Sequence, residues 1–191
     1  MSSVSQPFGL RPKYHGSGGL IRPTPGPYTI TTGYSSNILQ NQPVKIIPSS
    51  TGEGTLAAAA IGDHFIGTFQ GVEWTDTDGR RNYSNKWTAN VAGSDIVAYV
   101  TEDPNIIYEI QSNAALTVAD IGKQYNFTAI TAGSAVTGLS ALMLDVASVD
   151  TNASLQVMNI SPAPDNAWGD TYVIVQVRIS EHQFVADVAS F

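Results

Sequence analysis

The sequence predicts an all-β fold: an antiparallel β-sandwich or barrel with an extended N-terminal arm and at most one or two short helical turns. Short runs of alternating apolar and polar residues recur along most of the chain, separated by Gly, Pro, Asn, Asp and Ser. About ten such runs follow one another at intervals of roughly 10–12 residues, which is typical of sandwiches and barrels. Only 13% of the residues are charged, and small polar residues are correspondingly common.

Residues 1–27 form the predicted arm. Five prolines in this segment lack a backbone N–H group, and neither a helical nor a strand period can be counted. The first 52 residues carry four basic side chains and no carboxylate, whereas the remaining 139 carry five basic and all sixteen acidic side chains. The net charge of −7 therefore divides into +4 and −11. This composition indicates a basic arm whose order depends on the surface on which it lies.

The predicted β-rich body spans residues 28–191. Its clearest alternation lies near the C-terminus, where four apolar residues occupy every second position: Val173, Val175, Val177 and Ile179. A strand with this pattern buries one face. In chain order, the candidate strands are residues 28–32, 43–47, 64–75, 82–87, 95–101, 106–111, 125–130, 141–146, 154–160 and 172–183.

A β-hairpin is predicted over residues 72–84, because Asp78-Gly79 supplies two residues that tolerate positive φ in a type I′ turn. The same segment has the pattern Asp76-x-Asp78-Gly79, which resembles part of a calcium-binding loop. An EF-hand loop needs a glutamate six residues after the glycine, and Asn85 stands there instead. The sequence therefore favours the hairpin over a metal site.

Helix is predicted only in short pieces. Thr117 is placed to cap a helical turn over residues 118–121, which Gly122 ends. The alanine-rich run over residues 56–61 fits either a helical turn or an edge strand, and both alternatives remain open at this point.

No catalytic, cofactor or metal site is predicted, and the chain is not expected to be an enzyme. The absence of cysteine excludes disulfides, Cys-based zinc sites and thiol chemistry. The nearest match to a nucleophile elbow, residues 138–142, lacks the second glycine, and residues 117–124 lack the first glycine of a phosphate loop. The three histidines lie far apart in sequence, so each is predicted to be structural or at the surface: His15, His64 and His182.

The aromatic residues suggest packing rather than chemistry. Trp74, Tyr83 and Trp87 lie on the two arms of the predicted hairpin, where core filling is the expected role. Trp168 lies instead in the turn-rich loop over residues 162–170, and we predict that it is an interface anchor.

Charge and hydropathy exclude two classes of partner. The acidic body argues against nucleic acid, because binding to phosphates requires a basic surface. No apolar run approaches the length of a membrane span, and the N-terminus has no apolar core of a signal peptide.

Several segments together resemble the capsid decoration, or cement, proteins of tailed bacteriophages. These segments are QPFGLRP (residues 6–12), GVEWTD (71–76) with its return YSNKW (83–87), AYVTEDP (98–104) and ISEHQ (179–183). The resemblance is spread over most of the chain but rests on loose patterns rather than an invariant signature. It implies a β-rich body, commonly trimeric, that sits on the outer capsid surface at local three-fold positions with its arm laid over capsid subunits.

A protein of this kind is made in the host cytoplasm and becomes part of the virion, where it binds the major capsid protein and other copies of itself. Fully extended, the 27-residue arm could span up to roughly 90 Å, enough to reach a neighbouring subunit. The arm would supply apolar anchors and basic side chains to the capsid. The expected capsid contacts are Phe8, Leu10, Arg11, Lys13, Tyr14, Leu20, Ile21 and Arg22.

The alternative from another class is a receptor- or glycan-binding β module of a phage tail fibre or spike. It would share the trimer and the Ser/Thr/Asn-rich strands, but it should show a shaft, repeats or a surface aromatic cleft. The sequence shows neither of the first two. A third hypothesis, a carbohydrate-active enzyme, would need convergent carboxylates in a cleft.

Overall fold

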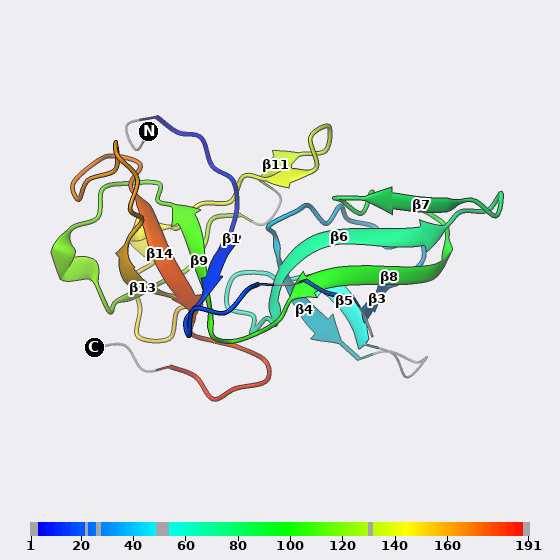
Figure 1. Ribbon diagram of the computed structural model, residues 1–191, viewed down its shortest axis with the longest axis horizontal. Coiled ribbons are helices and arrows are strands. Elements are labelled where there is room, and N and C mark those ends of the chain that lie inside the picture. Colours follow the sequence, from blue (N-terminus) through cyan, green and yellow to red (C-terminus); the bar gives the residue numbers. More distant parts are fainter. Residues whose placement is uncertain (1–3, 22, 26–27, 49–53, 130–131, 189–191) are drawn as a thin grey trace.

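The computed structural model describes residues 4–21, 23–25, 28–48, 54–129 and 132–188 (Figure 1). Within these ranges the fold is all-β, as the sequence predicts, and its helical elements are two 3-10 turns, η1 (Val118–Asp120) and η2 (Val146–Ser148). Two large sheets lie side by side along the long axis of the molecule. A short hairpin completes the described strands and consists of β11 (Gly133–Ser134) and β12 (Leu139–Ser140).

The first sheet has five strands and is antiparallel throughout. Its two edges are a strand from the predicted arm and a two-residue strand from the middle of the chain. In spatial order the strands are β1 (Arg11–His15), β9 (Ile106–Gln111), β14 (Ile174–Ile179), β13 (Leu155–Ile160) and β10 (Gln124–Tyr125).

The second sheet has seven strands and contains one parallel pair, β3 with β5. In spatial order six strands are β2 (Thr24–Pro25), β8 (Ser94–Thr101), β6 (Gly67–Thr75), β4 (Pro43–Ile47), β5 (Gly54–Ala58) and β3 (Tyr28–Ile30). The seventh strand, β7 (Arg81–Ser84), pairs with the C-terminal half of β6 and projects with it at one end of the molecule (Figure 1).

Each large sheet has its own hydrophobic core. The first core confirms the alternation predicted near the C-terminus, because all four of those apolar side chains are buried in it: Val173, Val175, Val177 and Ile179. The second core contains Trp87, which is 1% exposed and meets Trp74 edge to face at a centroid distance of 5.8 Å. Tyr83 does not pack as predicted: it is 72% exposed on β7.

The short helical turn forms where it is predicted. Thr117 is the N-cap of η1, and its backbone N–H and side-chain hydroxyl both donate to Asp120 Oδ2, at 2.7 and 2.9 Å. Gly122 follows the turn with φ +89°, a conformation that glycine adopts without steric cost.

The first half of the alanine-rich run, residues 56–58, belongs to a strand, and the run does not form a helical turn. Residues 54–58 form β5, which lies between β3 and β4 and is therefore not an edge strand either. The side chain of Ala57 in this strand is buried, and so is that of Ala59, which lies just after the strand. The strand predicted over residues 125–130 is reduced to β10, and the strand predicted over 141–146 does not form, because that range contains only isolated bridges at Leu144, one of them to Phe127, and the start of η2.

The hairpin of β6 and β7 is confirmed, but its turn differs from the predicted one. The last strand pair is Thr75 with Arg81, so five residues form the loop instead of two. Gly79 has φ +81°, whereas Asp78 does not have positive φ. The Asp76 carboxylate holds the loop by accepting hydrogen bonds from the backbone N–H groups of Asp78 and Arg80, at 3.0 and 2.9 Å.

Candidate functional site

The N-terminal segment is extended, and the surface on which it lies is the first sheet of this same chain. Arg11–His15 form β1, which pairs antiparallel with β9. Leu10 is fully buried in the first core, and its backbone N–H donates to Asn41 O at 2.9 Å. The prediction of a separate arm therefore needs correction, because a core side chain and a β-ladder attach this segment to the body. Leu10 is likewise a core residue and is not exposed for contact with a capsid.

A buried carboxylate attaches the two cations of β1. Glu109 on β9 is 1% exposed, and it meets Arg11 Nη2 at 2.6 Å and Lys13 Nζ at 3.1 Å. The Ser161 hydroxyl also donates to Glu109. Burial opposes ionisation of Glu109, but hydrogen bonds from Ser161, Arg11 and Lys13 outweigh it and hold the pKa of this carboxyl below its usual value. Arg11 and Lys13 therefore both pair with a carboxylate of their own chain.

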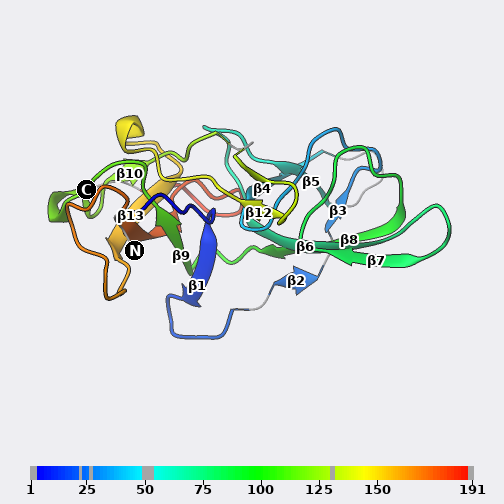
Figure 2. The same cartoon turned by 90° about the horizontal axis from the view of Figure 1, so that it is seen from above.

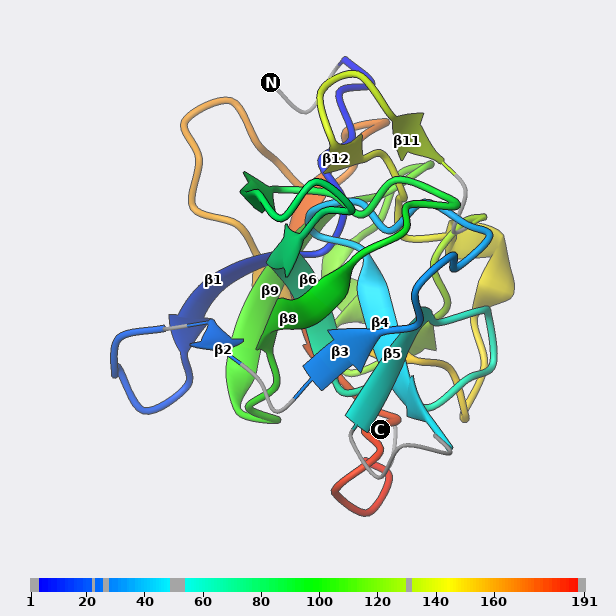
Figure 3. The ribbon, with the colours of Figure 1, turned by 90° about the vertical axis from the view of Figure 1, so that its right-hand side faces the viewer.

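The other predicted contact residues fall into two groups. Phe8 is half-buried, with the Arg11 guanidinium 4.4 Å from its ring centroid, and Ile21 packs partly buried against the first core. Tyr14 and Leu20 are 39% and 87% exposed. Leu20 belongs to the loop over residues 16–21, which projects from the side of the molecule in Figures 2 and 3.

Two predicted residues remain. Arg22 lies outside the described residues. Trp168 is half-buried and packs against the first core, so its ring has both an internal contact and an accessible part.

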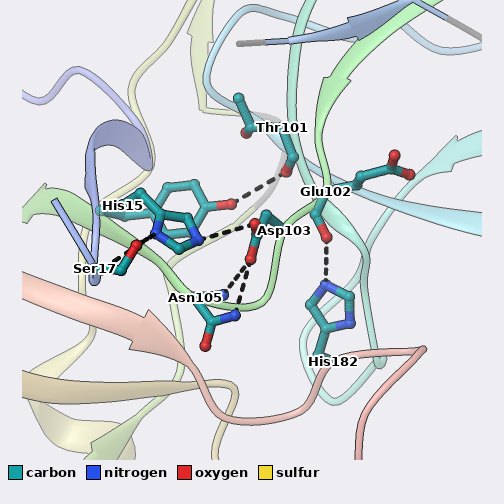
Figure 4. A network of polar contacts seen from close by, with 8 residues as sticks. His15, Ser17, Thr101, Glu102, Asp103, Asn105 and His182 are labelled. Atoms are coloured by element: carbon teal, nitrogen blue, oxygen red, sulfur yellow. Dashed lines mark hydrogen bonds and ion pairs between the residues drawn. The ribbon is translucent and has the colours of Figure 1, made fainter. Parts of the chain in front are cut away.

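A network of polar contacts surrounds the segment over residues 101–105, which connects β8 in the second sheet to β9 in the first (Figure 4). We call this segment the junction. The Tyr108 hydroxyl donates to Thr101 O at 3.1 Å, and the Tyr28 hydroxyl donates to the Glu102 carboxylate. The Asp103 carboxylate accepts from Asn105 N at 2.8 Å. Side chains from both sheets therefore fix the connection between them.

One histidine contacts the junction from each end of the chain. His15, at the end of β1, has Nε2 3.0 Å from Asp103 Oδ2. His182, which follows β14, has Nε2 3.0 Å from Glu102 O, and its Nδ1 accepts from Phe184 N at 3.1 Å. His182 is 3% exposed, and desolvation lowers its pKa below the ordinary value despite the carbonyl. The structural role predicted for these two histidines agrees with these contacts.

Ser17, His15 and Asp103 form a hydrogen-bonded chain of the residue types that serine hydrolases use. His15 Nδ1 accepts from the Ser17 hydroxyl at 2.7 Å and from Ser17 N at 3.2 Å, so Nε2 carries the proton donated to Asp103. A hydrolase also needs amide donors for the oxyanion, typically including the amide that follows the nucleophile. Here Gly18 N donates to His15 O at 2.7 Å. We therefore interpret the Ser17–His15–Asp103 hydrogen bonds as part of a turn that orients His15 toward the junction.

The described residues lack two further functional features. They contain no group of three or more His, Cys, Asp or Glu side chains placed to hold a metal ion. Among the same residues, no helix is both long enough and apolar enough to span a membrane.

Sequence reasoning missed both Glu109 and the junction. Glu109 and Asp103 are separated from their partners Arg11 and His15 by 98 and 88 positions, and no local motif connects them. The one available signal was the presence of a carboxylate at the centre of an otherwise apolar strand, Ile106 to Gln111, since a buried charge in a strand requires a partner.

No protein family matches this sequence, and no similar curated protein or solved structure was found.

Proposed function

We propose that this chain is a structural protein of a phage virion that decorates the outer capsid surface and cements neighbouring copies of the major capsid protein. The proposal includes synthesis in the host cytoplasm and a homotrimeric state. It comes from the resemblance of residues 6–12, 71–76, 83–87, 98–104 and 179–183 to capsid decoration proteins. No catalytic residue is assigned.

The observation that carries the proposal is the exposed loop beside β1. Leu20 is 87% exposed at this loop, and Tyr14 on the adjoining edge strand is 39% exposed. His15 holds the base of the loop through Asp103, so the apolar tip is presented on an ordered support. Covering a large apolar side chain of this kind with a partner removes apolar surface from water, which lowers the free energy of the complex.

The docked β1 strand changes how the arm would act. A free arm would reach from one capsid subunit to the next, but Leu10 and Glu109 keep residues 10–15 on their own body. In the revised proposal, the outer surface of the docked segment contacts the capsid. Three such surfaces on one trimer would act together, and weak individual contacts would then give slow release.

Binding to capsids tests the proposal directly. Purified protein is mixed with emptied phage heads from which decoration has been removed, and bound protein is measured by sedimentation. Leu20→Ala should weaken binding by about tenfold or more, since deleting an apolar interface anchor costs on the order of 1–2 kcal/mol. Val136→Ala is the matched control, because Val136 is 92% exposed on the β11–β12 hairpin, away from β1. Equal losses in both variants would contradict the role of the loop.

A groove bears on the alternative function, a glycan-binding module of a fibre or spike, although the residues that line it include no aromatic side chain. It has a volume of about 810 Å³ and lies beside β3, β5 and β8. Hydroxyl groups dominate its polar lining: Thr29, Thr31, Thr32, Thr55 and Ser94. Stoichiometry in purified virions separates the two functions. A copy number near that of the capsid protein supports decoration, whereas a few copies per particle together with binding to host surface glycans supports the alternative.

A further inference from the structure

A second hollow lies beside the junction, next to the exposed loop. It has a volume of about 440 Å³. Glu102, Asp103 and His15 supply its polar lining, and apolar side chains supply the remainder: Leu20, Ile21, Pro104 and Ile106. The hollow therefore places two carboxylate-bearing residues beside an apolar surface.

The two carboxylates have hydrogen-bond partners but, within the described part of the chain, no lysine or arginine partner. Glu102 accepts from the Tyr28 hydroxyl, and Asp103 accepts from His15 Nε2 and Asn105 N. Among the ion pairs of the described residues, neither carboxylate meets a lysine or an arginine. Both residues are half-buried, so solvent screens their charge less than at a fully exposed site.

Two basic side chains near the hollow do not have the partners that the sequence led us to expect. Arg11 and Lys13 were expected to bind acidic groups of a partner, but both bind Glu109 of their own chain. Glu109 offsets one of these two positive charges, and the chain as a whole carries a net charge of −7, so complementarity points to a basic partner surface.

We propose that the hollow binds a lysine or arginine side chain of the partner protein. Its aliphatic stem would pack on Leu20, Ile21 and Ile106, and its cationic group would lie beside the Asp103 carboxylate, with Glu102, whose side chain extends away from Asp103 in Figure 4, adding negative charge from farther away. Long basic side chains combine these two properties, because the stem is apolar and the head is charged. The inference rests on the proposed function, since it names the chemistry by which the capsid partner is recognised.

Titration with a small probe tests the hollow without capsids. N-acetylarginine amide is added to ¹⁵N-labelled protein, and amide shifts are followed by NMR. Citrulline, in N-acetylcitrulline amide, has nearly the same shape without the charge. We expect saturable shifts at residues 20–21, 102–103 and 105–106 with the arginine probe, and at least about fivefold weaker binding of the citrulline probe. Equal binding of both probes, or no shift in this region, would overturn the proposal.

Variants separate charge from packing. Asp103→Asn and Glu102→Gln should each weaken binding of the arginine probe, whereas Asp78→Asn, which removes an exposed carboxylate from the β6–β7 loop, should leave it unchanged. Unchanged amide spectra elsewhere confirm that each variant is folded. If the probe binds only after Arg22→Ala, the chain's own Arg22 is the occupant and the proposed partner side chain is wrong.

Binding to emptied heads distinguishes the two proposals. If wild-type protein binds heads and the Glu102→Gln/Asp103→Asn variant binds with the same affinity and salt dependence, the inference about the hollow fails while the proposed function stands. If the arginine probe binds the hollow but the protein does not bind heads, the proposed function fails and the hollow remains a site for basic side chains of another partner.

Discussion

Arg11 on β1 and Glu109 on β9 face each other at the edge of the first sheet, with Arg11 Nη2 2.6 Å from Glu109 Oε2. The cation is about half exposed, whereas the carboxylate is 1% exposed. The desolvation cost of the pair therefore falls mainly on Glu109. The stability of the N-terminal segment depends on keeping this one buried charge compensated.

Replacing Arg11 and Lys13 should therefore lower the free energy of unfolding more than replacing Arg11, Lys13 and Glu109 together. The Arg11→Ala/Lys13→Ala variant leaves Glu109 buried and uncompensated, and we expect a loss of about 3–5 kcal/mol in the free energy of unfolding. Adding Glu109→Gln to it removes the buried charge, and part of that loss should be recovered. Urea denaturation measures both free energies.

Limited proteolysis provides a second readout of the same cluster. Residues 8–15 should resist cleavage in the wild-type protein and become accessible in the variant without cations. The exposed Arg80→Ala change is a matched control for loss of a base and should leave the cleavage pattern unchanged. If the Arg11→Ala/Lys13→Ala/Glu109→Gln variant is less stable than the Arg11→Ala/Lys13→Ala variant, the buried charge of Glu109 is not the cause of the lost stability.

Stability should also decrease as the pH falls through the titration range of histidine. Burial holds the pKa of His182 below its ordinary value, so the unfolded chain takes up this proton before the folded protein does. We therefore expect full stability above about pH 7 and a decrease as the pH falls through roughly 6.5. Below about pH 4, a second decrease should follow, because Asp103 and Glu109 have lowered pKa values in the folded state.

His182→Gln should remove the first decrease and keep the second. His64→Gln is the matched control, because His64 is about half exposed and pairs with the exposed Asp187. Thermal melting between pH 3.5 and 8.5 measures these profiles. A wild-type profile that is flat from pH 8 to 5 would show that His182 does not control the first decrease.

The strands that could be predicted have a local signal. Val173, Val175 and Val177 alternate with residues of the opposite face, and the period of two is visible in the sequence alone. Thr117 similarly predicts its turn, since the cap partner Asp120 is three residues away. Short-range geometry is sufficient in both cases.

The features that could not be predicted depend on contacts between distant residues. The proline-rich N-terminal segment shows no strand period, so the sequence did not predict β1, which depends on contacts such as that of Arg11 with Glu109, 98 positions away. The 56–61 run is another example, because β5 is specified by two neighbouring strands and not by its own alanines. For the same reason the junction could not be inferred from His15 alone.

Two glycines with positive φ should respond very differently to substitution. At Gly67 (φ +153°), an added Cβ would lie 1.6 Å from Thr101 O, where β6 and β8 pair. Gly67→Ala should therefore destabilise the fold by more than about 4 kcal/mol or prevent folding. Gly79 has φ +81° but no atom within 4 Å of the added Cβ, so Gly79→Val should cost only about 1–3 kcal/mol of backbone strain. Urea denaturation ranks the two variants, and a larger cost at Gly79 would contradict the β6–β8 approach.

The two aspartates of the β6–β7 loop should also differ in their effects. Asp76 accepts backbone hydrogen bonds from Asp78 and Arg80 and a third from Asn82 Nδ2 at 3.0 Å, and the Arg80 amide in particular holds the pKa of Asp76 below its usual value. Asp76→Ala should therefore lower the melting temperature at pH 7, whereas Asp78→Ala, at an exposed position, should change it little. Calcium should leave the melting temperature of the wild-type protein unchanged, because both Asp76 oxygens already accept hydrogen bonds within the loop. A clear rise with calcium that Asp76→Ala abolishes would instead establish a metal site at this hairpin.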